Sequence, residues 1–161
     1  MNADKILDTM NQLGVSYLLI GGVNFMLRHE PILTFDVDLW IEDSDENRTR
    51  CEQSLAVLDA EWGQTDADWG PVAKKPAGWL ASQAVFCLHS PAGAIDIFRR
   101  VHGLADWQSS FQRSVAEATS SGIGYHGISD SDMLQCQLAL DASVQKASRI
   151  QTLQAKLKGN P

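Results

Sequence analysis

The sequence predicts an α/β (α+β) domain in which helices flank a mixed β-sheet and two further helices complete the C-terminal end. Helical and strand patterns alternate over residues 3–58, and two later strand patterns are joined by the turn sequence Ser90-Pro91-Ala92-Gly93. Of the 161 residues, 44% are hydrophobic. A chain of this length buries roughly 70% of its unfolded surface and needs no disulfides. No linker or repeat interrupts the pattern, so we expect one domain over residues 1–161.

The N-terminal third of the chain alternates between helix and strand. Apolar side chains recur on one helical face over residues 3–13, and residues 15–20 form a continuous apolar run of strand length. A short helix over 23–30 should end before the proline that follows it, because proline disfavours helical backbone in the preceding residue. Residues 35–42 alternate in polarity as a strand does, and a serine caps a helix over 44–58.

Residues 59–81 show no clear period and contain three tryptophans, two prolines and several glycines. We expect a long loop or irregular strand region there. Its tryptophans either stack on a base and close a lid over a site, or anchor the core, which is the commoner role of so large a side chain. The remaining predicted elements are strands over 84–89 and 94–101, a helix over 105–118, a strand over 122–128, and helices over 129–141 and 144–158.

Composition narrows the classes of function. Twenty acidic residues outnumber thirteen basic ones and give a net charge of −7, whereas broad nonspecific DNA binders are usually basic. No apolar run approaches the ~20 residues of a membrane span, and the N-terminus lacks a signal-peptide pattern. Cys51, Cys87 and Cys136 show no metal-binding spacing, so we expect reduced, mostly buried thiols in a cytoplasmic protein. A homodimer or a protein partner is compatible with the sequence.

Three aspartates interrupt apolar strand patterns. Asp36 and Asp38 are two residues apart in one strand and therefore project from the same face. Asp96 interrupts a later strand, and all three carboxylates meet if the two strands are neighbours. Like charges repel unless a cation lies between them, and three carboxylates with room for water suit Mg²⁺. We expect their oxygen atoms roughly 3–6 Å apart; a solvated sheet face is the alternative interpretation.

Gly21 and Gly22 follow the first strand and begin the next helix. Glycine lets the backbone approach a phosphate closely, and a helix N-terminus offers free N–H donors and a positive dipole. A simple tight turn is the alternative interpretation, so the pair indicates phosphate binding only in combination with the aspartates.

Taken in order, these segments resemble the nucleotidyltransferase superfamily with a DNA polymerase β-like palm. The resemblance is carried by Tyr17-Leu18-Leu19-Ile20-Gly21-Gly22, then Asp36-Val37-Asp38-Leu39, then Ile95-Asp96-Ile97. Within the superfamily, the chain is most similar to small bacterial AbiEii/AbiGii-type nucleotidyltransferase-like proteins. That closer similarity lies in residues 22–39 and in the C-terminal stretch 128–153.

The resemblance implies a reaction and a set of site residues. Asp36 and Asp38 would bind Mg²⁺, with Mn²⁺ as an alternative, together with the phosphates of a nucleoside triphosphate (NTP). Asp96 would complete the metal site and help to deprotonate an acceptor hydroxyl, and Gly21 and Gly22 would hold the phosphates. The hydroxyl would attack the α-phosphorus and release pyrophosphate. The acceptor implied is a protein, an RNA end or a small hydroxylated molecule.

One feature of the family is absent. Many relatives carry a lysine in the penultimate helix that faces the site, whereas Gln135 and Gln137 stand near that position here. A cation is needed to stabilise phosphate charge. Four basic residues are candidates to replace it: Lys74, Lys75, Arg99 and Arg100. Without such a cation, the alternative function is a catalytically weak or inactive nucleotide-binding module, or a toxin–antitoxin-like interaction component.

Overall fold

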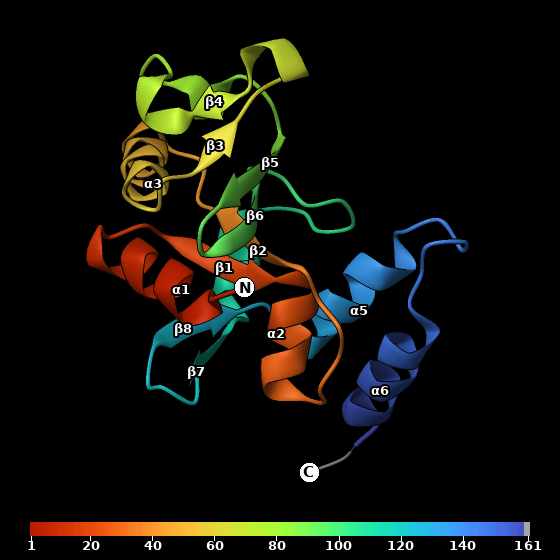
Figure 1. Cartoon of the computed structure of the whole chain (residues 1–161). Coiled ribbons are helices and arrows are strands. Elements are labelled where there is room, and N and C mark those ends of the chain that lie inside the picture. Colours follow the sequence, from red (N-terminus) through yellow and green to blue (C-terminus); the bar gives the residue numbers. More distant parts are fainter. Residues whose placement is uncertain (160–161) are drawn as a thin grey trace.

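Eight strands form one sheet in the order β4-β3-β5-β6-β2-β1-β8-β7 (Figure 1). The structure is a computed structural model and describes residues 1–159. The sheet is mixed, because β1 pairs with β8 and β2 with β6 in parallel, whereas the other pairs are antiparallel. The strands are β1 (Tyr17–Ile20), β2 (Asp36–Ile41), β3 (Glu61–Trp62), β4 (Gly70–Pro71), β5 (Val85–Ser90), β6 (Gly93–Phe98), β7 (Val115–Ala118) and β8 (Gly124–Gly127).

Helices cover both faces of this sheet (Figure 1). They are α1 (Ala3–Gln12), α2 (Gly21–Arg28), α3 (Asp45–Val57), α4 (Trp107–Gln112), α5 (Asp130–Leu138) and α6 (Ala147–Leu157). The expected mixed sheet with flanking and C-terminal helices is therefore confirmed. No helix among residues 1–159 is long and apolar enough to cross a membrane.

Two hydrophobic cores lie on opposite faces of the sheet because side chains alternate along each strand. Val37 and Leu39 of β2 are fully buried on the face that α1 and α3 cover. Trp40, the residue after Leu39, packs on the other face with Met133 of α5 and Leu153 of α6. Asp36 and Asp38 alternate with Val37 and Leu39 and so share the face of Trp40. The alternation predicted for this strand thus decides which face carries the acids.

The prediction of a helix over 105–118 is wrong for the second half of that segment. Helix α4 ends at Gln112, and residues 115–118 form β7, which pairs antiparallel with β8. The sequence Val-Ala-Glu-Ala of β7 is mostly exposed and contains good helix formers. Local propensity therefore favoured helix, whereas pairing with a distant strand decided the structure.

The irregular segment 59–81 folds as two short strands and three 3₁₀ turns. Trp62 and Trp79 stack with their ring centroids 5.3 Å apart, and both lie edge-on against Phe86 of β5. These two tryptophans are buried and anchor the core, while Trp69 is 45% exposed. Core anchoring, rather than a lid, is the role of Trp62 and Trp79.

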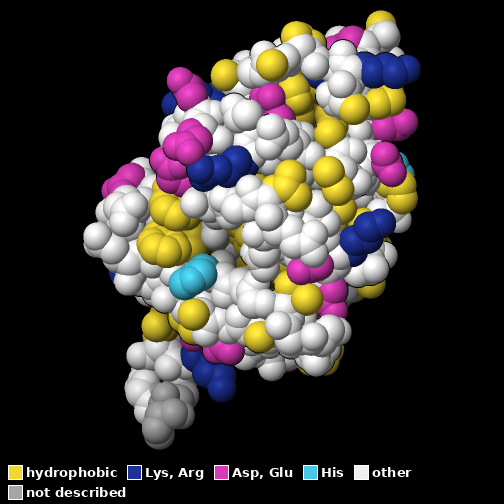
Figure 2. Space-filling view, turned by 90° about the vertical axis from the view of Figure 1, so that its left-hand side faces the viewer, with side chains coloured by type: hydrophobic (Ala, Val, Ile, Leu, Met, Phe, Trp, Pro, Cys, Tyr) yellow, Lys and Arg dark blue, Asp and Glu magenta, His cyan; other side chains and the backbone are white. Residues whose placement is uncertain are grey.

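The surface that Figure 2 shows carries lysine and arginine side chains as separate groups, with acidic side chains between several of them. The three cysteines of the chain are free. Cys51 is buried and Cys136 partly buried, but Cys87 is exposed, so the expectation of mostly buried thiols is wrong for Cys87. It lies on β5 on the same side of the sheet as the acids, where no helix covers it.

Candidate active site

The pairing of β2 with β6 brings the three predicted aspartates together. The two strands are parallel, and Asp38 lies directly opposite Asp96, while Asp36 precedes Asp38 on the same face. One carboxylate oxygen from each of Asp36, Asp38 and Asp96 lies within 4.8 Å of the others. This agrees with the separation expected for a shared ion. We call these three residues the acid cluster.

Electrostatics in the acid cluster disfavours three ionised carboxylates. Burial, followed by the charges of Asp36 and Asp96, raises the pKa of Asp38 to about 7, although the Gly22 backbone N–H and Arg149 act in the opposite direction. The pKa of Asp96 is raised as well, first by burial and then by Asp36. The acid cluster therefore has an excess of negative charge that a bound cation would neutralise.

Gly21 and Gly22 lie against the acid cluster because β1 is the neighbour of β2. Gly21 has a positive φ of 67°, and a Cβ atom there would come within 2.0 Å of Oδ2 of Asp38. A Cβ atom on Gly22 would come within 2.6 Å of the Thr34 hydroxyl oxygen. Helix α2 begins at these glycines. Gly21 thus combines a left-handed turn with close approach to Asp38, whereas at Gly22 a side chain is excluded by Thr34.

Arg149 is a cation beside the acid cluster that we did not predict from the sequence. It lies in the first turn of α6, and Nη2 would be 3.3 Å from a Cβ on Gly22. Its guanidinium carbon lies 5.7 Å from the ring centroid of Phe25. Burial lowers the pKa of Arg149, and the charges of Asp38 and Asp36 partly offset that effect. The guanidinium therefore belongs to the same electrostatic group as the acids.

A signal for Arg149 was present in the sequence. Arg149 precedes the inward-facing Leu153 by four residues, so the helical period places both on one face. An arginine on the apolar face of a helix is unusual unless it has a partner. What the sequence did not show is that α6 packs against α5 and so brings Arg149 over Phe25 of α2, beside the acid cluster.

Two of the four basic residues considered as candidate cations have other partners. Lys75 lies over the ring of Trp62 and donates to the backbone oxygen of Asp68. Arg99 donates to both carboxylate oxygens of Asp43 and to backbone oxygens of the segment before β5. Lys74 and Arg100 are exposed. Arg149, rather than any of these, faces the acids.

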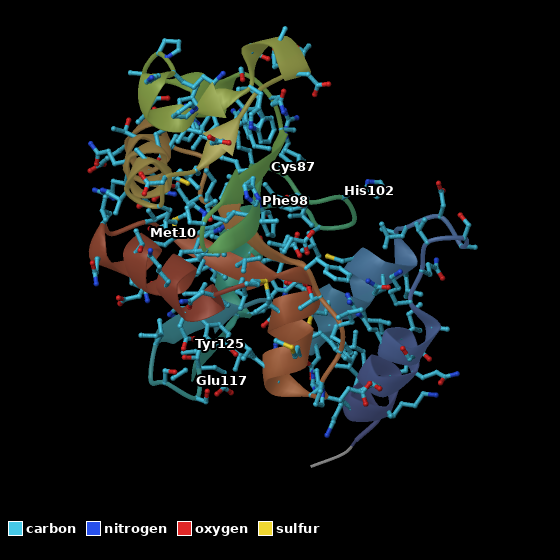
Figure 3. All side chains as sticks on the ribbon, in the orientation of Figure 1. Met10, Cys87, Phe98, His102, Glu117 and Tyr125 are labelled. Carbon is cyan, nitrogen blue, oxygen red and sulfur yellow. The ribbon has the colours of Figure 1, made fainter. Side chains whose placement is uncertain are left out.

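A hollow of about 770 Å³ begins one step along the strands from the acid cluster, although none of the three acids lines it. Trp40 and Phe98 line it, each two residues after an acid on its strand, and His102 lines it from the loop after β6. Figure 3 shows Phe98 and His102 on the side of the sheet toward α5. The hollow has the volume of a site for a drug-sized molecule.

Comparison with known proteins identifies the fold. No family model matches the chain, and no curated protein sequence matches it. Among solved structures, the lincosamide antibiotic adenylyltransferase LnuA, bound to lincomycin, superposes with a TM-score of 0.63 at 14% identity, over 96% of this chain and 97% of that chain. ANT(2'')-Ia with adenylyl-2''-tobramycin gives a TM-score of 0.62 at 14% identity, over 96% and 87%.

A proposed nucleotidyltransferase of Thermotoga maritima superposes with a TM-score of 0.53 at 15% identity, over 96% of this chain and 89% of that chain. The chain therefore has the fold of these nucleotidyltransferases along nearly its whole length.

Proposed function

We propose that the protein is a Mg²⁺-dependent nucleotidyltransferase that moves a nucleoside monophosphate from an NTP to a hydroxyl group of a small molecule. The acid cluster is the observation that carries this proposal. Three carboxylates on two rigid, hydrogen-bonded strands, with oxygen atoms within 4.8 Å, form a donor set that hard divalent cations prefer.

Asp36, Asp38 and Asp96 would hold Mg²⁺, with Mn²⁺ as an alternative. When bound, the metal supplies positive charge that neutralises the acids and the phosphates of the nucleotide. The raised pKa of Asp38 fits this role, because that carboxylate ionises fully near neutral pH only when a cation offsets the neighbouring charges.

Arg149 and the start of α2 would bind the phosphates. A triphosphate adds about four negative charges to three carboxylates, and two divalent ions offset about four of these seven. Arg149 and the backbone N–H groups at Gly21 and Gly22 would offset part of the remaining negative charge. An arginine from α6 thus takes the place of the lysine that is absent from α5.

Asp96 would accept the proton of the acceptor hydroxyl. The hydroxyl oxygen forms a bond to the α-phosphorus, the bond from that phosphorus to the pyrophosphate oxygen breaks, and pyrophosphate leaves with the electron pair. Asp96 suits a general base because its pKa is raised toward neutrality. It is also the acid on the β6 side, from which Phe98 leads into the hollow of about 770 Å³.

The solved structures support a small hydroxylated acceptor. One holds lincomycin and the other an adenylylated tobramycin, and each superposes over nearly all of this chain. The hollow that begins at Trp40 and Phe98 has the volume for an acceptor of that size. A protein or RNA acceptor, membership of the AbiEii/AbiGii-type branch and a toxin–antitoxin-like role remain predictions from the sequence.

A nucleotide panel tests the proposed function. The protein is titrated with ATP, GTP, CTP and UTP, each with Mg²⁺ and with EDTA, by calorimetry. At least one NTP should bind, and only with Mg²⁺. Incubating that NTP with a pool of hydroxylated small molecules should then release pyrophosphate. Binding without release under any acceptor would favour a non-catalytic nucleotide-binding module, and absence of binding would contradict the proposal.

A further inference from the structure

The segment that leads into β2 has an inverted pattern of polarity. Leu33 and Phe35 are 79% and 73% exposed, whereas Thr34 between them is partly buried. The alternation of β2, continued back by two residues, puts Thr34 on the face that carries Asp36 and Asp38. Folding alone favours the opposite arrangement, with the large apolar side chains turned inward and the hydroxyl in water. The inward hydroxyl beside the acid cluster is therefore a candidate for ligand binding.

Thr34 and Arg149 converge on one point above Gly22. A Cβ atom on Gly22 would lie 2.6 Å from the Thr34 hydroxyl oxygen and 3.3 Å from Nη2 of Arg149. Gly22 is buried beneath them, while both side chains stay partly exposed, so a ligand can reach them from solvent. At this spacing one phosphate group can accept hydrogen bonds from both donors.

Neither donor has a close acceptor within residues 1–159. The Thr34 hydroxyl lies 3.5 Å from the backbone oxygen of Asp36, well beyond the usual distance of about 2.7–2.8 Å for a hydroxyl donor. Arg149 makes no hydrogen bond or ion pair there; it contacts the ring of Phe25 and is attracted to the acids at longer range. One neutral and one cationic donor are thus available to a bound anion.

The strand order places these donors on the opposite side of β2 from Asp96. Strand β2 lies between β6, which carries Asp96, and β1, which leads into Gly22 (Figure 1). In-line displacement puts the entering and the leaving oxygen on opposite sides of the phosphorus. With Asp96 on the side of the entering hydroxyl, pyrophosphate would leave toward the start of α2, where Thr34 and Arg149 meet.

We propose that Thr34 is a further substrate-binding residue, whose hydroxyl acts with Arg149 to hold the pyrophosphate portion of the NTP, an inference that rests on the proposed function. The hydroxyl donates to a phosphate oxygen, and the guanidinium supplies the positive charge. Residue 22 is a glycine because the Thr34 hydroxyl occupies the space that a side chain there would need.

The substitution T34V tests this role, because valine keeps the branched shape and removes the hydroxyl. Calorimetric titrations use Mg²⁺–pyrophosphate and the Mg²⁺ complex of the NTP that binds the natural sequence. T34V should weaken both tenfold or more, since it removes a hydrogen bond to a charged acceptor, and T34S should restore most of the affinity. T49V removes an exposed hydroxyl from α3, on the other face of the sheet, and should bind both ligands as the natural sequence does.

Titration with Mg²⁺ alone separates phosphate binding from a structural role. T34V should bind Mg²⁺ alone within twofold of the natural sequence, because the hydroxyl is no ligand of the metal. An equal loss for Mg²⁺ alone and for Mg²⁺–pyrophosphate would mean that Thr34 only positions the acids. That result, or an unchanged affinity of T34V for pyrophosphate, would overturn the inference and leave the proposed function standing. If the natural sequence bound neither NTP nor pyrophosphate, both would be overturned.

The double substitution T34V/R149Q tests whether the two side chains hold the same phosphate group. If they do, the loss of pyrophosphate affinity in the double variant should differ more than threefold from the product of the two single losses, because residues that share a partner are not additive. A loss within threefold of that product would show that the two side chains act on separate groups, which would contradict their joint role.

Discussion

At Asp38 the requirements of folding and of ligand binding conflict. The carboxylate is largely buried beside two other acids, and these surroundings raise its pKa to about 7. A side chain selected only for stability would not carry a charge at this position, since an apolar or amide group would avoid the repulsion. The position is instead suited to holding a cation. A substitution of Asp38 should therefore change stability and cation binding in opposite directions, and both changes can be measured.

We predict that D38N stabilises the metal-free protein at pH 8 and abolishes Mg²⁺-dependent NTP binding. Asparagine keeps the shape and can still accept from the Gly22 N–H, but it removes the repulsion. The gain should be about 1–3 kcal/mol, because one pKa unit corresponds to ~1.4 kcal/mol. Urea unfolding in EDTA and calorimetric titration of NTP measure the two effects. A loss of stability would instead identify Asp38 as a structural residue of the core.

At Arg149 we predict a large effect on nucleotide affinity and a small one on folding. R149Q should weaken Mg²⁺–NTP binding tenfold or more, equivalent to ~1.4 kcal/mol, because it removes the cation beside the acids and Gly22. R149K should recover part of the affinity. R50Q removes the same charge from α3, on the other face of the sheet, and serves as the matched control. Equal affinities for R149Q and R50Q would exclude Arg149 from phosphate binding.

At the scale of elements, the junction of β1 and α2 positions the backbone against β2. We predict that G21A destabilises the fold and impairs Mg²⁺ binding. Its Cβ atom would lie 2.0 Å from Oδ2 of Asp38, and the positive φ adds a strain of about 1 kcal/mol. Thermal unfolding and calorimetric Mg²⁺ titration measure these effects.

The matched control for that substitution is G70A, in β4. A Cβ atom there would have no heavy atom within 4 Å, so we expect a change in stability within about 0.5 kcal/mol. If G21A changed stability and Mg²⁺ binding as little as G70A does, the close approach of the start of α2 to the acid cluster would not be required for either property.

Across the whole molecule, the acid cluster should affect how stability depends on pH. An unfolded Asp38 ionises near its ordinary pKa of 3.8, whereas the folded, metal-free residue ionises at about 7. Between these values the folded state binds more protons than the unfolded state, so this residue lowers the free energy of unfolding as pH rises. Below about pH 4 Asp38 makes no destabilising contribution to the free energy of unfolding, and above about pH 7 that contribution no longer changes with pH.

We therefore predict that the stability of the metal-free protein, measured relative to D38N, falls between about pH 4 and pH 7. Urea unfolding of both proteins in EDTA across this range gives the difference directly. At pH 8, Mg²⁺ should raise the melting temperature of the natural sequence but not of D38N, because a ligand stabilises only the state that binds it. A difference that does not vary with pH would mean that Asp38 titrates normally.

The sequence by itself determined the features that depend on short separations along the chain. Alternation fixed Asp36 and Asp38 on one face of a strand, and the serine expected to cap the helix over 44–58, Ser44, does cap α3. The motif order was sufficient for the nucleotidyltransferase fold, which the superposed structures share.

Only the tertiary structure decided what depends on elements distant in sequence. Pairing of β2 with β6 brought Asp96 to the other acids, and pairing with β8 made residues 115–118 a strand despite their helical propensity. Packing of α6 placed Arg149 beside the acid cluster. Local patterns define which face of an element is apolar or charged, but the free energy of packing selects which faces meet.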